Sequence, residues 1–102
     1  MNTIRKTDQF AAWFNALADP KAKFRITTRI RSATDGNFGD CRSVGEGVFE
    51  MRIHYGPGYR VYYARDGATV YLLLIGGDKN SQPRDIAAAH DLWKRFKKGT
   101  GP

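Results

Sequence analysis

Apolar and polar residues follow strand-like patterns in three consecutive segments in the middle of the chain. These segments are Val48–Tyr55, Tyr59–Arg65 and Thr69–Ile75. Gly56-Pro57-Gly58 separates the first two and Asp66-Gly67 separates the last two, so each boundary is expected to be a tight turn. The third segment is almost continuously apolar, which is typical of a strand covered on both faces. The pattern predicts an antiparallel meander whose last strand is central.

Alternation along the first of these segments sorts its side chains onto two faces, because strand side chains have a period of two. One face carries Glu50, Arg52 and His54, and the other carries the apolar Phe49, Met51, Ile53 and Tyr55. Arg60 follows the turn and can join the cations across the hairpin. Asp78-Lys79 leaves the third strand where a polar end must emerge. A cationic surface beside a core is therefore predicted.

Helical periodicity marks two segments near the N-terminus. An apolar stripe predicts a helix over Asp8–Ala18, capped by Thr7 or Asp8, and Asp19-Pro20 is typical of the start of a second helix that ends near Gly36. The stripe of the first helix consists of Phe10, Trp13, Phe14 and Leu17. The outer faces of the second carry cations that can grip phosphates or form an ordinary solvated surface: Lys21, Lys23, Arg25, Arg29 and Arg31.

A third helix is predicted near the C-terminus. Ser81 or Gln82 can cap it, Pro83 suits its first turn, and its final turn is basic. Its apolar stripe comprises Ile86, Ala89, Trp93 and Phe96, and the basic turn comprises Lys94, Arg95, Lys97 and Lys98. Weaker patterns predict an edge strand at Asn2–Lys6, a strand within Gly39–Gly45 and a flexible tail at 99–102. The fold class is therefore α+β, with a single domain over residues 1–102.

Charge and length narrow the classes of function. The chain has 102 residues and a formal net charge of +7, which favours a polyanion or an acidic protein as partner over a merely solvated basic surface. Cys41 is the only cysteine, which excludes an internal disulfide and a multi-cysteine zinc site. The longest apolar run is too short to span a membrane, and the N-terminus lacks the apolar segment of a signal peptide. We expect a cytoplasmic protein without a membrane partner.

Several motifs together resemble one family. They are Gly56-Pro-Gly-Tyr-Arg-Val-Tyr-Tyr63, Gly76-Gly-Asp-Lys-Asn-Ser-Gln82, the strand Gly47-Val-Phe-Glu-Met-Arg52 and Asp85-Ile-Ala-Ala-Ala89. In combination they resemble the RelE/ParE toxin superfamily over nearly the whole chain, and most closely its addiction-module killer branch near HigB. The resemblance implies a RelE-like fold and the toxin of a type II toxin-antitoxin pair, with a cognate antitoxin, of the helix-turn-helix HigA-like type, as partner.

The same resemblance implies an activity and positions for its residues. RelE-like and HigB-like toxins cut messenger RNA on the ribosome, while ParE-like toxins inhibit DNA gyrase. Arg52 lies where RelE-like toxins place a lysine, Arg60 matches their Tyr-Arg arginine, and Lys79 lies near the basic residue after the last strand. The tyrosine at the start of their last helix is absent, because Gln82-Pro-Arg-Asp-Ile86 stands there. A histidine, lysine or aspartate must then transfer the proton.

Metal-free RNA cleavage by the 2′-hydroxyl needs a base, cations for the phosphorane and an acid for the leaving oxygen. Arg52 and Arg60 suit the phosphorane because guanidinium matches phosphate oxygens with paired donors. Lys79, among other cations, can act as base or acid, and His54 can shuttle protons at neutral pH. The chain has no metal-site spacing, phosphate loop or Ser-His-Asp order, so we expect no cofactor. RNA contacts are expected at Arg42, Tyr59, Asp78, Gln82, Lys94 and Lys98.

Each of these assignments has a simpler alternative. Arg52 and Arg60 can pair with Glu50, Asp66 or a terminal carboxylate, and His54 can be a merely exposed residue. Asp78 can be an ordinary turn acid, and His90 borders the apolar stripe of the last helix. The tyrosines can stack on unpaired bases, although alternation places about half of them in the core. The alternative functions are a ParE-like gyrase inhibitor without nuclease activity and a non-toxic basic RNA-binding domain.

Overall fold

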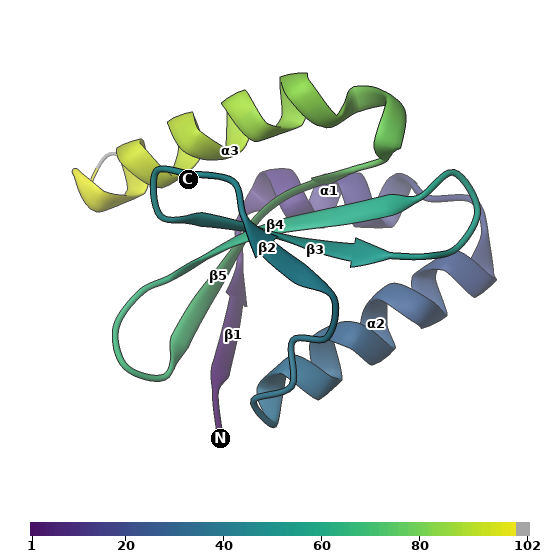
Figure 1. The fold of residues 1–102 in the computed structure, drawn as a ribbon, viewed down its shortest axis with the longest axis horizontal. Helices are drawn as coiled ribbons and strands as arrows, with labels where there is room; N and C mark the ends of the chain where they lie inside the picture. Colours follow the sequence, from purple (N-terminus) through teal and green to yellow (C-terminus); the bar gives the residue numbers. More distant parts are fainter. Residues whose placement is uncertain (100–102) are drawn as a thin grey trace.

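The computed structural model describes residues 1–99 and has helices on both faces of one sheet (Figure 1). The tail predicted at 99–102 lies, beyond Gly99, outside the described residues. The elements in chain order are β1 (Thr3–Lys6), α1 (Asp8–Ala16), α2 (Pro20–Thr34), β2 (Cys41–Ser43), β3 (Val48–Ile53), β4 (Tyr59–Arg65), β5 (Val70–Gly77), the 3₁₀ turn η1 (Lys79–Ser81) and α3 (Gln82–Lys97). The predicted α+β class and element order are confirmed.

The sheet has five strands in the order β1-β5-β4-β3-β2. β1 pairs with β5 in parallel, and every other neighbouring pair is antiparallel. The predicted meander is therefore correct, and β1 is the edge strand expected from its weak pattern. The prediction that β5 is central is wrong in one respect: it is an interior strand, and β4 occupies the middle of the sheet.

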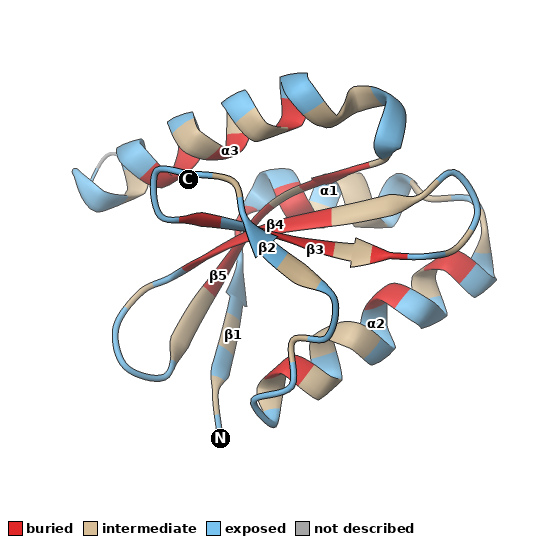
Figure 2. Cartoon of the chain, in the orientation of Figure 1, coloured by how far each residue is buried: buried red, intermediate tan, exposed pale blue. Residues whose placement is uncertain are grey.

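The two faces of the sheet bury separate cores (Figure 2). α1 and α2 cover one face, where Phe10 and Ile26 pack against Met51, Val61 and Leu73. α3 covers the other, where its buried residues pack against Val48, Tyr62, Ala64, Leu72 and Leu74. Met51 and Val48 belong to different cores, as alternation along β3 requires. Burial on both faces explains why β5 is apolar without interruption.

Element ends depend on local hydrogen bonds that the sequence suggested in part. Thr7 caps α1, since its Oγ1 accepts from Phe10 N at 2.9 Å, and Asp19 caps α2 by accepting from Lys21 N at 2.9 Å. β3 ends at Ile53 instead of at the predicted Tyr55, because the backbone then turns through the Gly56–Gly58 loop. α1 ends at Ala16, two residues before the predicted end.

Gly76 and Gly77 end β5 at a point where both faces of the sheet are closely covered. A Cβ on Gly76 would lie 2.2 Å from a ring carbon of Trp13 in α1, and one on Gly77 would lie 1.8 Å from Oδ2 of Asp85 in α3. Distances this short exclude any side chain larger than hydrogen unless a helix moves. The two glycines therefore allow α1 and the start of α3 to approach the end of β5 from opposite sides.

Candidate functional site

Four residues occupy one row across the sheet, near the ends of β3, β4 and β5. Arg52 pairs with Arg60 across the hairpin, Arg60 pairs with Gly77, and the amide of Arg52 donates to the carbonyl of Asp40 at 2.9 Å. We call Asp40, Arg52, Arg60 and Gly77 the arginine row. Arg60 and Gln82 of α3 both donate to Glu50, so the row lies on the face of the sheet that α3 covers. The register brings Arg52 and Arg60 together.

The neighbouring row contains a buried carboxylate, Glu50, which is 0% exposed. Its Oε1 accepts from Arg42 Nε at 3.0 Å and from Arg60 Nη1 at 3.2 Å. Its Oε2 accepts from Tyr62 Oη at 3.0 Å and from Gln82 Nε2 at 2.7 Å. We call these residues the Glu50 cluster. It satisfies a buried charge with four donors, as burial of a carboxylate requires.

The balance of burial and hydrogen bonding decides the charge state of Glu50. Burial alone raises the pKa of its carboxyl, but hydrogen bonds from Gln82, Arg42 and Tyr62 and the positive charge of Arg60 together hold that pKa below its usual value. Burial and the negative charge of Glu50 raise the pKa of Tyr62, which keeps its hydroxyl a donor. Glu50 is therefore an anion that anchors Arg42, Arg60 and the first turn of α3.

A second carboxylate, Asp40, joins Arg52 and His54. Its Oδ1 lies 3.1 Å from Arg52 Nη2, and its Oδ2 lies 2.5 Å from His54 Nε2. The hydrogen bond from His54 is the main cause that lowers the pKa of Asp40, and Arg52 lowers it further. Asp40, which precedes β2, thus holds the side chains of Arg52 and His54 next to each other on the same face of the sheet.

Some nitrogen donors of the arginine row have no partner. The Nε atoms of Arg52 and Arg60 are buried, and neither has a hydrogen-bond partner within residues 1–99. The side chains as a whole remain open to different degrees, with Arg52 36% and Arg60 13% exposed. Each arginine is thus anchored through one terminal nitrogen, and a further acceptor can approach only the other terminal nitrogen, because Nε is buried.

Lys79 lies beside the turn that connects β3 and β4. A side chain on Gly58 would start 3.5 Å from the Cβ of Lys79, and Lys79 is exposed in η1. Asp78 caps this 3₁₀ turn, because its Oδ1 accepts from Asn80 N at 2.8 Å and from Ser81 N at 3.2 Å. Asp78 thus stabilises the turn that positions Lys79, which agrees with the simpler alternative of an ordinary turn acid.

The remaining predicted RNA-contacting residues are not gathered in one place. Arg42 and Gln82 belong to the Glu50 cluster, whereas Tyr59 packs edge-on against Trp13, with ring centroids 6.2 Å apart, on the face opposite Arg60. Lys94 is exposed about 18 Å along α3 from Gln82, at about 1.5 Å per residue, and Lys98 lies past the helix end. These two lysines lie away from the arginine row. His90 Nε2 lies 3.0 Å from the carbonyl of Val44.

Arg29 of α2 is a support for this site. Its Nη1 donates to the carbonyl of Arg52, and its Nη2 donates to the carbonyls of Phe38 at 2.9 Å and of Asp40 at 3.3 Å. A Cβ on Gly39 would lie 2.7 Å from the Arg29 guanidinium, so the loop before β2 closes tightly over it. Unlike the solvated or phosphate-binding cation considered from the helix pattern, Arg29 fixes two backbone segments that carry site residues.

Sequence reasoning missed Asp40 and Asp85 and treated Glu50 only as a possible partner. Asp85 is 6% exposed, lies beneath Gly77 and accepts from the hydroxyl of Ser81. A signal existed for Glu50, since a glutamate within an apolar alternating strand needs a compensating cation when buried. Asp40 carried no such signal, because its role depends on how β2 pairs with β3.

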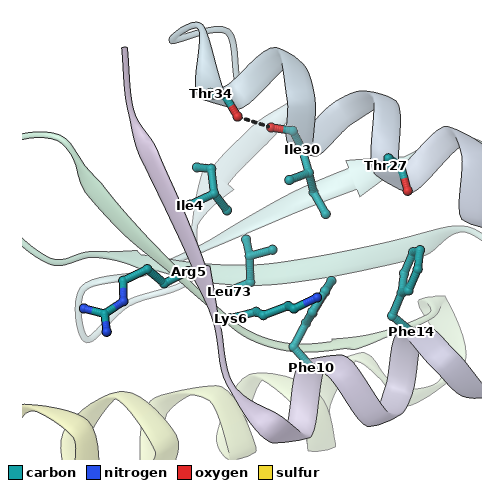
Figure 3. Close-up of a pocket in the computed structure, with 9 residues that line it drawn as sticks. All are labelled: Ile4, Arg5, Lys6, Phe10, Phe14, Thr27, Ile30, Thr34 and Leu73. Carbon is teal, nitrogen blue, oxygen red and sulfur yellow. Dashed lines mark hydrogen bonds between the residues drawn. The ribbon is translucent and has the colours of Figure 1, made fainter.

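A separate open groove lies along the free edge of β1, between α1 and α2 (Figure 3). Its volume is about 550 Å³, and Lys6 points over it while Arg5 points away from it. Its lining residues are Ile4, Arg5, Lys6, Phe10, Phe14, Thr27, Ile30, Thr34 and Leu73. The groove therefore combines an apolar floor with a basic rim, on the face opposite the arginine row.

Residues 1–99 contain no group of three or more histidine, cysteine or acidic side chains placed to hold a metal ion. None of the helices described is long and apolar enough to cross a membrane.

The fold has a counterpart among solved structures. A chain in the crystal structure of the intact E. coli RelBE toxin-antitoxin complex matches with a TM-score of 0.63, over 76% of this chain and 96% of that chain. The sequence identity is 10%, so the likeness concerns the fold. The protein has a RelE-like fold, as its motifs implied.

One relative is close in sequence. An uncharacterized protein of Haemophilus influenzae (strain ATCC 51907 / DSM 11121 / KW20 / Rd) is 44% identical over 86 residues, which are 84% of this chain and 87% of the relative. The chain belongs to the same family as this Haemophilus protein. No family model matches the sequence.

Proposed function

We propose that this protein is the toxin of a type II toxin-antitoxin pair, of the HigB-like branch, and that it cuts messenger RNA on the ribosome. The observation that carries the proposal is the cross-strand pair Arg52 and Arg60, which presents two guanidinium groups on one face of a RelE-like sheet. Guanidinium binds phosphate oxygens through paired N–H donors, and such donors stabilise charge that develops in a transition state. The structural neighbour is a toxin-antitoxin complex, which supports the same assignment.

The proposed reaction is an internal transfer within the RNA. The 2′-oxygen attacks the adjacent phosphorus, the bond from phosphorus to the 5′-oxygen breaks, and a 2′,3′-cyclic phosphate and a 5′-hydroxyl result. Arg52 and Arg60 are assigned to the phosphorane oxygens, and His54 and Lys79 to the two proton transfers. His54 is 74% exposed and Lys79 lies beside the same turn, so both can be reached by a bound strand.

The proposed partner is a co-expressed acidic antitoxin, possessing a helix-turn-helix domain, that covers the surface around the arginine row. The reason is charge: a small domain of net charge +7 attracts an acidic chain over a long range. Hydrogen exchange of the complex tests the location. Backbone amides in the turn at 54–58 and in η1 should exchange more slowly in the complex. Slower exchange confined to the groove along β1 would contradict an antitoxin that covers the arginine row.

A gyrase inhibitor is the second candidate, and one observation favours it. Both arginines already have carboxylate partners, Asp40 for Arg52 and Glu50 for Arg60. If these ion pairs only stabilise the sheet, Arg52 and Arg60 have no role in RNA cleavage, and the protein would act by binding another protein. A toxin of this kind would arrest growth without producing new RNA ends.

Induction in a bacterial host separates these functions. The wild-type chain, Arg52→Ala and the matched control Arg65→Ala would be induced, with mapping of transcript 5′ ends and a DNA supercoiling assay on the same cultures. Arg65 is an exposed cation at the other end of β4 whose guanidinium donates to the backbone carbonyls of Gly67 and Ala68. New 5′ ends with wild type and the control, but not with Arg52→Ala, are expected. Altered supercoiling without new ends would favour the gyrase inhibitor.

A further inference from the structure

We infer that Asp40 is a positioning residue that presents His54 to RNA as the proton acceptor, with Nδ1 as the accepting atom. This inference rests on the proposed ribonuclease function and names the group that replaces the missing tyrosine. It starts from the contact between His54 Nε2 and Asp40 Oδ2, at 2.5 Å.

The contact defines which nitrogen of His54 is available. A carboxylate can only accept, so Nε2 carries the hydrogen and donates it to Asp40. The lone pair of neutral His54 is then on Nδ1, for which no partner occurs within residues 1–99. Because the side chain is 74% exposed, that lone pair is accessible to a bound substrate.

Asp40 is held in place by three contacts. Its second oxygen accepts from Arg52 Nη2 at 3.1 Å, and its carbonyl accepts from the amide of Arg52 at 2.9 Å and from Arg29 Nη2 at 3.3 Å. Arg29 also bonds to the carbonyl of Arg52, so the same guanidinium supports both sides of the contact. A carboxylate fixed in this way limits the positions of an otherwise exposed ring.

The charged groups around His54 connect it with the proposed phosphate site. Asp40 is the anion in direct contact with the ring, and Arg52 is the cation on the other oxygen of Asp40. Arg60 lies across the hairpin from Arg52, and Lys79 lies beside the turn that follows His54. Asp40 is therefore in contact with the ring that receives the proton, and Arg52 and Arg60 are placed to bind the phosphate next to the reacting 2′-hydroxyl.

The proton balance of the step is closed by Lys79. Nδ1 accepts the proton of the 2′-hydroxyl as the 2′-oxygen bonds to phosphorus. The 5′-oxygen leaves with the electron pair of its bond to phosphorus and takes a proton from the Lys79 ammonium. The imidazolium then gives its Nδ1 proton to water, and Lys79 regains one from water, which restores both side chains.

Single-turnover cleavage by the full chain on ribosomes programmed with a defined messenger RNA tests the inference. Asp40→Ala should lower the cleavage rate about tenfold or more, part of the ~10²–10⁴-fold that a positioned base contributes, with little change in the toxin concentration giving half the maximal rate. In a His54→Gln background the same change should cost much less, because Asp40 acts mainly through the ring and only its contact with Arg52 is then lost. Asp40→Asn keeps an acceptor oxygen for His54 Nε2 without the charge, so it should retain more activity than Asp40→Ala.

The control is Asp35→Asn, at an exposed aspartate that ends α2 and takes no part in the site. It should retain the wild-type rate, and melting temperatures of all variants identify any loss caused by unfolding. A folded Asp40→Ala protein with the full rate, or losses that multiply in the double variant, would overturn the inference while leaving the ribonuclease intact. A wild-type protein that produces no cut RNA would overturn the proposed function and the role of Asp40 with it.

Discussion

Arg52 and Arg60 lie directly opposite each other on β3 and β4, and each is held by a different carboxylate. The Cα atoms of such antiparallel partners are about 4.5–5.5 Å apart, a distance at which like charges destabilise a sheet. Asp40 compensates Arg52 at the rim, and buried Glu50 compensates Arg60 inside. Each carboxylate contacts one terminal nitrogen of its arginine, so this internal pairing does not exclude the proposed phosphate contacts.

The Glu50 cluster should make the fold sensitive to acid. The pKa of Glu50 is lower in the folded chain than its usual value near 4.5, so the charged form stabilises the fold above that pH. This contribution is lost as the pH falls from about 4.5 through the lower folded value. The free energy of unfolding, measured with urea between pH 7 and pH 3, should therefore decrease over the acidic part of the range.

Glu50→Gln tests the origin of that decrease, with Glu46→Gln in an exposed loop as its control. The amide removes the charge and gives the cluster a donor where two arginines need an acceptor, which should cost about 1–3 kcal/mol at pH 7. The difference from wild type should shrink in acid. Asp19 and Asp40, whose pKa values are also lowered by their hydrogen bonds to Tyr55 and His54, leave some acid sensitivity in the variant. An unchanged pH dependence would exclude Glu50 as its source.

Gly77→Ala should displace the start of α3. The new methyl group would meet Asp85 and the hydroxyl of Ser81, so overpacking should cost about 1–3 kcal/mol in urea unfolding. Asp85→Ala removes the clashing carboxylate, and the double variant should therefore be more stable than the sum of the two single losses indicates. Strictly additive losses would mean that the backbone of β5, and not Asp85, requires a glycine at position 77.

RNA or ribosome binding should weaken steeply with salt. Neutralisation of several phosphates by arginine and lysine releases counterions, so affinity should fall strongly between about 50 and 200 mM salt. Binding would be measured at several salt concentrations for wild type and for Arg52→Ala, whose dependence should be less steep because one phosphate contact is lost. An affinity that does not change with salt would contradict a phosphate-dominated interface.

Local patterns predicted most of the fold because each depends on burial of one face. The stripe of α1 packs in a core, as do Met51 and Ile53 of β3. The alternation in β3 fails at two positions, because Phe49 is exposed and Glu50, on the polar face, is buried. Element ends were less accurate. The turn η1 was not predicted, because Asp78 forms a capping arrangement with Ser81 that competes with the cap expected for α3.

The site was predictable only where it depends on one hairpin. Arg52 and Arg60 share a face because both lie near the same turn, so alternation and pairing together place them. Asp40 reaches Arg52 and His54 through the register between β2 and β3, and Arg29 reaches them from a helix on the other face. Such contacts join segments far apart in the chain, and no local period indicates them.

Arg60 distinguishes most clearly between a structural and a catalytic role. Its side chain is 13% exposed and bonds to the fully buried Glu50, so Arg60→Ala should lower the free energy of unfolding by about 1–3 kcal/mol. If Arg60 also binds the phosphorane, toxicity should be abolished even at temperatures where the variant remains folded. Arg60→Lys keeps the charge but lacks the planar pair of donors, so it should retain RNA binding better than cleavage.

Growth arrest, thermal melting and transcript cleavage would be measured for both variants and for Arg65→Ala, which removes an exposed cation elsewhere on β4. A purely structural Arg60 predicts instead that toxicity falls only in proportion to folded protein, and a folded, fully toxic Arg60→Ala chain would remove the residue from the site.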